Sequence, residues 1–386
     1  MANLYDVIVV GLGAMGSATA YELARRGKRV LGLERYTPAH DKGSSHGRSR
    51  IIRQAYFEHP DYVPLLLRAY ELWERLERDS GQRLLTITGG LMMGPPGSAV
   101  VAGAMRSAQE HGLPHEMLDA TEIRRRFPPF NPGPETVALY EPIDGVLDPE
   151  ACIRAFLDQA ARLGAELRFE ESALSWQAAP SGDGVRVTTG EGVYEAARLV
   201  VAPGAWAPML LSGLGLPLTV ERQVLYWFEP LGGVGPFLPE HFPIYIWEVR
   251  PEIDLYGFPA QDGPPGGVKV AFYRLGDEGA CTPETIDRTV RPFEVERMRA
   301  ALAEGIPSLN GELRAALTCM YTNTPDQHFV IGMQPRQPQV VVASPCSGHG
   351  FKFASVIGEI LADLALDSAT RHPIGLFDIG RFAVTR

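Results

Sequence analysis

Three glycines near the start of the chain have the spacing of a phosphate-binding turn. Gly11, Gly13 and Gly16 follow directly on the apolar, β-branched run at 5–10, and an alanine-rich helical stretch comes after them. The first glycine permits a tight turn, the second lets backbone N–H groups approach a pyrophosphate at a helix N-terminus, and the third allows close packing of helix on strand. These residues predict a dinucleotide-binding unit.

An acidic residue at the end of the next strand narrows the choice of dinucleotide. The short apolar run at 30–33 ends on Glu34, whose carboxylate can accept hydrogen bonds from ribose hydroxyls. A carboxylate at this point disfavours NADP, because it would repel the extra phosphate. The spacing therefore favours FAD.

Lysine is rare in this chain, and two of its lysines have unusual surroundings. Of 36 lysine and arginine residues only four are lysine, which leaves 36 − 4 = 32 arginines. A compact ammonium and a planar guanidinium do different chemistry. Lys28 and Lys42 are typical surface residues, whereas Lys269 and Lys352 lie in apolar, glycine-containing segments. Lys269 and Lys352 are therefore candidate functional residues.

Length and composition describe an ordinary globular protein. The chain has 386 residues, of which 45% are hydrophobic and 21% charged, enough for two domains. Its net charge of -10 argues against nucleic-acid and anionic-membrane partners. The first apolar run starts with Asp6 and contains the glycines, so it is not a signal peptide, and a cytoplasmic location without a membrane span is expected. The cysteines lack metal-ligand spacing, so neither a metal site nor a disulfide framework is expected: Cys152, Cys281, Cys319 and Cys346.

The pattern of hydrophobic residues changes several times along the chain. Helical periodicity predicts helices at 60–79, 149–163 with Asp148 as cap, 283–303, and from the turn at 347–350 to about 366, with helix and loop over 98–128. Apolar runs predict strands at 84–93, 166–170, 184–189, 198–202 before a glycine turn, 317–322 and 340–343, and a strand-rich region over 217–275 with a turn at 263–267.

Strand–glycine–helix units at both ends of the chain, with strand-rich sequence between them, predict an α/β (α+β) fold. We expect a Rossmann-like FAD-binding domain with an inserted substrate domain built on a mixed or antiparallel sheet. The FAD-binding domain is assigned to 1–83, 145–216 and 325–386, and the substrate domain to 84–144 and 217–324.

Several motifs in order over nearly the whole chain carry a family resemblance. They are GLGAMG with Glu34, GSSHGRSRIIRQAY at 43–56, YVPLLLRAYELW at 62–73, YGFPA at 256–260, CMYTNTPDQHF at 319–329 and SGHGFKFAS at 347–355. The chain resembles the monomeric sarcosine oxidase family, within the FAD-dependent amine oxidases that include N-methyltryptophan and pipecolate oxidases. The resemblance implies oxidation of a secondary amine on an N-methyl amino acid to an imine, which water hydrolyses, with O2 reduced to H2O2.

The resemblance also assigns a role to one cysteine. A cysteine in an apolar strand is by itself most often a small buried hydrophobe. Cys319, followed by Met320, Tyr321 and Thr322, matches the cysteine that family members join through sulfur to a methyl group of FAD. Cys346 stands where relatives carry an apolar residue and is expected to pack.

A substrate with a free carboxylate needs a cation, and Arg53 and Lys352 match the family's pair. Charge-assisted contacts would hold the carboxylate and so place the amine at the flavin. The alternative for Arg53 is a salt bridge at a helix edge. Lys352 opens the last helix, where a cation is unfavourable unless an anion lies nearby, either the substrate or reduced flavin.

Other residues match the family's reaction site. Lys269 corresponds to the lysine beside the flavin where oxygen reacts, and a fixed cation there lowers the cost of superoxide. Arg50 is expected close to the flavin ring. Tyr256 and Tyr321 match aromatic residues that line the amine site, although unmatched they would be core tyrosines. Tyr273 departs from the family, because close sarcosine oxidases carry a histidine there, which affects the pH profile and the size of the accepted amine.

The fingerprint and the resemblance together predict the cofactor contacts. His46 lies in the loop after Glu34, and His349 shapes the last turn or contacts flavin rather than acting as a base. The full set of expected cofactor contacts is Gly11, Gly13, Met15, Gly16, Glu34, Arg35, His46, Arg50, Gly204, Cys319, Gly348, His349, Gly350 and Lys352.

Alternatives from other classes remain at this point. The chain could be an FAD amine dehydrogenase that passes electrons to a carrier protein, or a non-catalytic FAD-binding subunit. Bulkier N-methyl amino acids and cyclic imino acids such as proline or pipecolate share the carboxylate and secondary amine of sarcosine. Relatives are commonly monomers, and a monomer is expected here.

Overall fold

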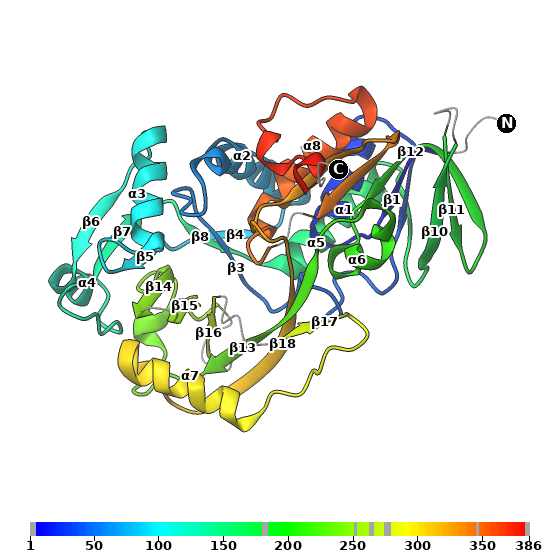
Figure 1. The fold of residues 1–386 in the computed structure, drawn as a ribbon. Coiled ribbons are helices and arrows are strands. Elements are labelled where there is room, and N and C mark those ends of the chain that lie inside the picture. Colours follow the sequence, from blue (N-terminus) through cyan, green and yellow to red (C-terminus); the bar gives the residue numbers. More distant parts are fainter. Residues whose placement is uncertain are drawn as a thin grey trace.

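The computed structural model describes residues 5–179, 184–250, 253–261, 266–273, 279–344 and 347–382. Its strands form two large sheets and a small sheet, with helices on the outer faces (Figure 1). The mixed α/β architecture confirms the predicted fold class.

The first sheet contains the predicted nucleotide-binding unit. Its centre consists of parallel strands in the order β20 (Gln337–Ser344), β12 (Val193–Val201), β1 (Tyr5–Val10), β2 (Val30–Leu33) and β9 (Glu166–Arg168). Antiparallel neighbours are β10 (Ala173–Ala178), β11 (Val185–Thr189) and β19 (Val330–Gln334). Val7, Ile8 and Val9 are fully buried, as in parallel strands covered on both faces.

Helices cover this sheet closely. They are α1 (Ala14–Arg25), α2 (Val63–Ser80), α5 (Pro149–Arg162), the short α6 (Ala207–Leu210) and α8 (Ala354–Asp367). The predicted cap of α5 is confirmed, since Asp148 Oδ1 accepts a hydrogen bond from Ala151 N at 2.8 Å. Helices α1 and α8 touch at Gly358, where an added Cβ would lie 2.7 Å from Ala18. The start of α1 is thereby held rigidly against the sheet.

The second large sheet is mixed and carries the other side of the molecule. Its main path runs β17 (Ala280–Cys281), β13 (Thr219–Phe228), β16 (Val268–Phe272), β15 (Ile253–Gly257), β14 (Ile244–Arg250), β5 (Gly90–Gly94), β7 (Val137–Glu141) and β6 (Glu116–Asp119), and β18 (Leu313–Asn323) also pairs with β13. Helices α3 (Ala99–His111), α4 (Ala120–Arg126) and α7 (Pro292–Gly305) pack around it (Figure 1). A separate core of aromatic and aliphatic side chains lies beneath this sheet, including Phe130, Phe242 and Trp247.

A small antiparallel sheet joins the two large ones. It consists of β3 (Arg50–Ile52), β8 (Gly145–Leu147) and β4 (Leu85–Ile87). β8 leads into α5 of the first unit and follows β7 of the second sheet, so the chain crosses between the two units here. The expected domain ranges stay a prediction.

The predicted strand at 84–93 is wrong as a single element. The chain breaks at Gly89, whose φ is +71°, and an added Cβ there would lie 2.6 Å from the Tyr140 hydroxyl oxygen. β4 before the break belongs to the small sheet, and β5 after it belongs to the second large sheet. A glycine in the left-handed region turns the chain from one sheet to the other.

Other predicted boundaries also need correction. The helix expected at 283–303 begins only at Pro292, because Arg291 before it is extended (φ -92°, ψ 150°), the conformation that a following proline imposes. Lys352 lies in a 3-10 turn at Phe351–Phe353 and does not open α8. Strands β3, β6, β7, β8, β10, β17 and β19 were not predicted. Cys346 and most of the turn at 263–267 lie outside the described residues.

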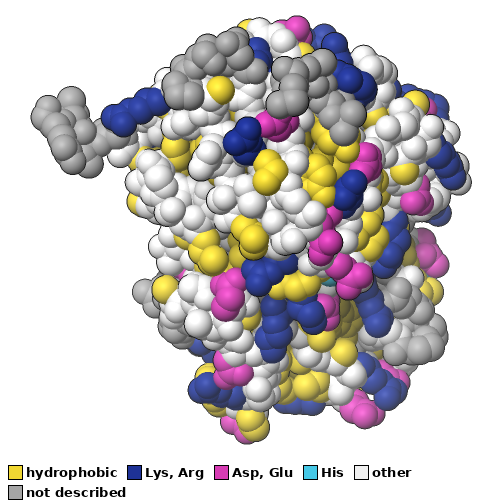
Figure 2. Space-filling model, turned by 90° about the vertical axis from the view of Figure 1, so that its right-hand side faces the viewer, with side chains coloured by type: hydrophobic (Ala, Val, Ile, Leu, Met, Phe, Trp, Pro, Cys, Tyr) yellow, Lys and Arg dark blue, Asp and Glu magenta, His cyan; other side chains and the backbone are white. Residues whose placement is uncertain are grey.

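The surface mixes charges of both signs. Figure 2 shows acidic and basic side chains interspersed with small hydrophobic areas on the face that carries β10 and β11. Among the described residues, no helix combines the length and the apolar composition needed to cross a membrane.

Candidate functional site

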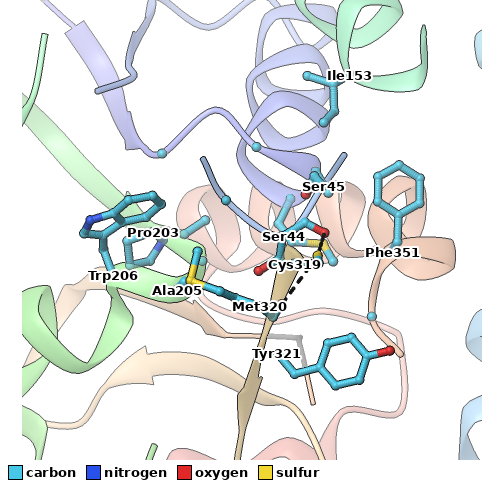
Figure 3. Close-up of a pocket in the computed structure, with 18 of the residues that line it drawn as sticks. Ser44, Ser45, Ile153, Pro203, Ala205, Trp206, Cys319, Met320, Tyr321 and Phe351 are labelled. Carbon is cyan, nitrogen blue, oxygen red and sulfur yellow. Dashed lines mark hydrogen bonds between the residues drawn. The ribbon is translucent and has the colours of Figure 1, made fainter. Parts of the chain in front are cut away.

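A cavity of about 510 Å³ begins at the carboxyl ends of the central parallel strands and reaches the second sheet. Its wall includes the segments 10–15, 43–45, 202–206, 319–321 and 348–352. Figure 3 shows Cys319 of β18 directed toward Ser44, with Tyr321 and Phe351 beside it. Ligands of open α/β sheets bind at this edge, where the strand order reverses.

The three positions of the fingerprint are occupied by glycine for different structural reasons. At Gly11, whose φ is +87°, an added Cβ would lie 2.5 Å from the carbonyl oxygen of Ala202. At Gly16, an added Cβ would lie 1.6 Å from the carbonyl oxygen of Gly11. At Gly13, which caps α1 on the cavity wall, the nearest atom is Ser45 Oγ at 3.9 Å. Gly11 and Gly16 are thus required by packing, and Gly16 lies beneath the wall. Gly13 keeps open the space in front of the helix N-terminus, where backbone N–H groups would receive a pyrophosphate.

Glu34 lies at the cavity wall and orders its surroundings. Its Oε2 accepts a hydrogen bond from Leu12 N at 2.8 Å, and its Oε1 accepts one from Tyr36 N at 3.1 Å. His40 Nε2 is 3.4 Å from Oε1. The carboxylate therefore ties the glycine turn to the end of β2, with lone pairs left for a ribose.

Arg35, Gly204 and Met15, three of the expected cofactor contacts, line this end of the cavity. Arg35 Cζ lies 5.7 Å from the Trp206 ring centroid, and its Nη1 is 3.2 Å from Glu284 Oε1. Gly204 has a φ of +55° and starts the short turn that carries Trp206. Trp206 was not predicted as a site residue.

Arg50 organises the loop that forms one side of the cavity. Its guanidinium donates to the carbonyl oxygens of Ser49, Ser44 and His46 at 2.7, 2.8 and 2.7 Å. Glu150 fixes the same loop from outside, accepting from Gly47 N at 2.7 Å. Arg50 thus lines the cavity and determines the loop conformation.

Cys319 lies on the cavity wall and is 3% exposed. Burial would raise the pKa of its thiol, but the adjacent His46 and the charge of Arg50 outweigh this and lower the pKa to about 7. His46 is buried and does not line the cavity, and it lies beside the Cys319 thiol. The environment increases the fraction of thiolate, which is the nucleophilic form.

Lys269 lies behind the cavity wall, not on it. Its Nζ donates to the carbonyl oxygens of Gly47 and Ser49 at 2.7 and 3.0 Å, and lies 4.7 Å from the Phe258 ring centroid. Burial and the Arg50 guanidinium hold the pKa of Lys269 well below its usual value. The carbonyl oxygens and the ring face favour the charged form.

Arg53 and Lys352 meet around the ring of Tyr56, as the predicted pair. Arg53 Cζ is 4.0 Å and Lys352 Nζ 5.2 Å from the ring centroid, and both side chains lie on the cavity wall. Lys352 Nζ donates to the His349 carbonyl oxygen at 2.7 Å. Burial and the charge of Arg53 lower the pKa of Lys352 to about 7. An anion bound between the two cations would raise the pKa of Lys352 again.

Arg53 has a carboxylate partner that the sequence analysis did not identify. Its Nη2 donates to Glu58 Oε2 at 2.5 Å, so the salt bridge weighed for Arg53 exists. Burial works against the charge, but Glu58 raises the pKa of Arg53. Arg53 Nε is buried and has no hydrogen-bond partner among the described residues. The salt bridge therefore leaves part of the guanidinium available.

Three tyrosines, Tyr256, Tyr273 and Tyr321, also line the cavity. Tyr256 and Tyr273 meet edge to face with ring centroids 6.3 Å apart, and burial together with Tyr321 raises the pKa of Tyr256 well above its usual value. Tyr273 donates its hydroxyl hydrogen to Glu58 Oε1 at 2.8 Å. Tyr273 thus holds the carboxylate that pairs with Arg53.

The predicted turn at 348–350 closes the cavity near Lys352. Gly348 has a φ of +77°, and an added Cβ would lie 2.8 Å from the Tyr321 ring. His349 Nδ1 is 2.6 Å from the Tyr56 hydroxyl, and its Nε2 is 3.0 Å from the Gln327 carbonyl oxygen. His349 therefore shapes the turn through Tyr56, while still lining the cavity with Gly350.

The residues around the cavity fit FAD. The space before Gly13 is open to a pyrophosphate, Glu34 lies at the ribose position, and Cys319 lies farther along the same cavity. Ser44 Oγ, on the cavity wall, is buried without a hydrogen-bond partner among the described residues, which leaves a polar atom for a ligand. Fold and site define an FAD-dependent oxidoreductase.

Comparison with known proteins agrees with this class. Residues 6–364 match the family model described as FAD dependent oxidoreductase. The chain is 58% identical over 384 residues to a monomeric sarcosine oxidase of Streptomyces avermitilis, with 99% of each chain covered. It is 41% identical over 390 residues to a monomeric sarcosine oxidase of a Bacillus species, covering 100% of this chain and 98% of the relative. The chain belongs to the monomeric sarcosine oxidase family.

A solved structure shows the same fold. NikD, described as an unusual amino acid oxidase essential for nikkomycin biosynthesis, superposes in its open form with a TM-score of 0.82. It is 27% identical, and the match covers 97% of each chain.

Proposed function

We propose that this protein is an FAD-dependent oxidase of N-methyl amino acids and that sarcosine is its preferred substrate. One observation carries the proposal. The cavity that begins at the dinucleotide fingerprint ends at two buried cations, Arg53 and Lys352, around Tyr56. A flavin site that ends in paired cations is suited to a substrate with a carboxylate.

The two cations would orient the substrate. The carboxylate binds between Arg53 and Lys352 and raises the pKa of Lys352 from about 7, so that both groups are charged in the complex. This contact fixes the α-nitrogen and its methyl group in the tyrosine-lined part of the cavity. Tyr256 and Tyr321 exclude water from the amine, which must be neutral to react.

The overall reaction balances as an oxidation followed by hydrolysis. FAD held by the glycine turn, Glu34 and Cys319 would supply the hydride acceptor and the route by which electrons reach O2. The amine loses a hydride and a proton to become an imine, and water converts the imine to the amino acid and an aldehyde. Oxygen takes up two electrons and two protons to give H2O2.

The test of function is a peroxide assay over a substrate panel. We expect stoichiometric H2O2 from sarcosine and less from bulkier N-methyl amino acids, proline and pipecolate, because the ring of Tyr273 occupies part of the cavity wall. A protein that reduces an artificial dye with sarcosine but consumes no O2 would be a dehydrogenase. Failure of all panel members to reduce the flavin would contradict the proposal.

We also propose that FAD is attached covalently through Cys319. The thiol lies on the cavity wall beside His46 and Arg50, which lower its pKa to about 7. A thiolate is therefore present at neutral pH for bond formation to a flavin methyl carbon.

Purified protein should be yellow and keep its colour on the polypeptide after acid denaturation, because a thioether survives unfolding. Cys319→Ser should bind FAD reversibly and lose most of its activity. The partly exposed Cys281, which is not on the cavity wall, provides the control as Cys281→Ser. Release of all flavin from the wild-type protein into the acid supernatant would contradict covalent attachment.

Arg53→Met should weaken saturation by N-methyl amino acids by on the order of 2 to 4 kcal/mol, because the lost ion pair is buried. Simple N-methylamines, which have no carboxylate, should lose much less. The matched control is Arg222→Met, since Arg222 is also buried and paired with Glu294 away from the cavity. Equal losses for both substrate classes, measured by kcat/KM, would mean that Arg53 has only a structural role.

We further propose that Lys269 promotes the reaction with O2. Its ammonium lies behind the loop at 47–49 and would stabilise negative charge developing on oxygen in the cavity. A lysine held by two carbonyl oxygens stays in place throughout the reaction.

Lys269→Met should leave anaerobic flavin reduction by sarcosine nearly intact and slow reoxidation by roughly two powers of ten, or about 3 kcal/mol. Lys269→Arg should restore only part of the rate, because its larger guanidinium spreads the charge. Stopped-flow absorbance separates the two steps. Slowed reduction with normal reoxidation would assign Lys269 to the amine, and equal slowing of both would assign it to loop structure.

A further inference from the structure

Two buried carboxyl groups lie where the chain crosses from the second sheet to the small sheet. Glu141 ends β7, Asp144 directly precedes β8, and they are 1% and 0% exposed. Because β8 pairs with β3 through Gly145 and Ile52, this corner lies beside the chain segment that follows β3. Neither residue lines the cavity, so neither touches the substrate in the proposed function.

These carboxyl groups hold the backbone that carries Arg53. Ala55 N donates to Glu141 Oε2 at 2.7 Å, and Gln54 N donates to Asp144 Oδ1 at 3.2 Å. Arg53 Nη1 in turn donates to the Ala55 carbonyl oxygen at 3.1 Å. A continuous hydrogen-bonded path therefore runs from the carboxyl pair through Ala55 to the guanidinium.

The remaining oxygens of the pair have no donor of their own in the described part of the chain. Glu141 Oε1 and Asp144 Oδ2 are buried and receive no hydrogen from another donor among the described residues. The two carboxyl groups are neighbours, because they accept hydrogen bonds from the consecutive backbone N–H groups of Gln54 and Ala55. Two ionised carboxylates in this buried corner would repel each other, and one proton between them removes that repulsion. A single proton satisfies both oxygens and leaves one negative charge on the pair.

We propose that Glu141 and Asp144 share one proton and act as positioning residues that hold Arg53 for the substrate carboxylate. This inference rests on the proposed function, since it concerns the same carboxylate site. The backbone of Tyr56 is held from another side, because Ser107 of α3 donates to its carbonyl oxygen at 2.6 Å. The segment from Arg53 to Tyr56 is thereby fixed at both ends.

The shared proton also keeps an additional negative charge away from the carboxylate site. The charged and titratable groups that face the pair are Arg53, Lys352 and Tyr70. Tyr70 donates its hydrogen to the Ile143 carbonyl oxygen at 3.2 Å and so does not serve the pair. Burial raises the pKa of Glu141 and, with the charge of Glu141, raises that of Asp144 well above its usual value. Because the folded-state values are raised, the pair's contribution to stability declines as the pH rises toward them.

The test compares three variants of the flavin-containing protein. Asp144→Asn places an amide N–H where the shared proton lies, Asp144→Ala removes the contact, and Glu294→Ala removes an equally buried carboxyl group on α7 that does not contact the Arg53 segment. The readouts are the Kd of acetate from flavin absorbance, kcat and KM for sarcosine, and the unfolding temperature from pH 6 to 10.

We expect Asp144→Ala to raise the Kd of acetate and the KM of sarcosine about tenfold, with a smaller change in kcat. Asp144→Asn should keep both constants near their wild-type values. As the pH rises, its stability should fall less than that of the wild type. Glu294→Ala should lower the unfolding temperature without changing the Kd of acetate. If Asp144→Ala does not fold, the pH dependence of the unfolding temperature of Asp144→Asn decides whether the pair shares a proton.

The proposal fails if Asp144→Ala binds acetate as tightly as the wild type, or if Asp144→Asn is as impaired as Asp144→Ala. An unchanged pH dependence of stability in Asp144→Asn would also overturn it. Wild-type protein that binds acetate but gives no peroxide with sarcosine would contradict the proposed function and leave the positioning role supported.

Discussion

The burial of positive charge is the constraint on which the site depends. Arg50, Lys269 and Lys352 donate hydrogen bonds to backbone carbonyl oxygens of the cavity loops. Arg53 donates to a backbone carbonyl oxygen and also to the Glu58 carboxylate. Carbonyl oxygens satisfy the hydrogen-bonding groups of a cation without cancelling its net charge. The loops are thereby given their shape by these side chains, and because burial lowers the pKa of Lys269 and Lys352, an anionic ligand would stabilise their charged forms.

The two large sheets contribute different parts of this arrangement. The first sheet supplies the glycine turn and Glu34, and the second supplies Cys319 and the tyrosines on strands that end at the cavity. The small sheet carries Arg50 at the start of β3 and leads directly to Arg53. Placing both arginines on the connection between the sheets makes the carboxylate site depend on how the two units are packed.

Tyr273 takes part in the hydrogen-bonded network around Arg53. Its hydroxyl binds Glu58, and Glu58 binds Arg53, so the tyrosine is connected to the carboxylate site through one carboxylate. A histidine at this position would have a different reach and its own titration. The tyrosine therefore bears on how firmly Glu58 stays with Arg53, and its ring also lines the cavity.

The sequence by itself determined the dinucleotide unit, because its signals are local: glycine spacing, a buried strand and an acid at the next strand end. Family motifs brought Cys319, Arg53 and Lys352 to notice, and all three line one cavity. Only the tertiary structure decided that Lys269 lies behind the wall, that Glu58 pairs with Arg53, and that β4 and β5 belong to different sheets. Those outcomes depend on contacts between segments that the chain brings together only on folding, and a hydrophobic pattern records that a residue is buried but not which partner it meets.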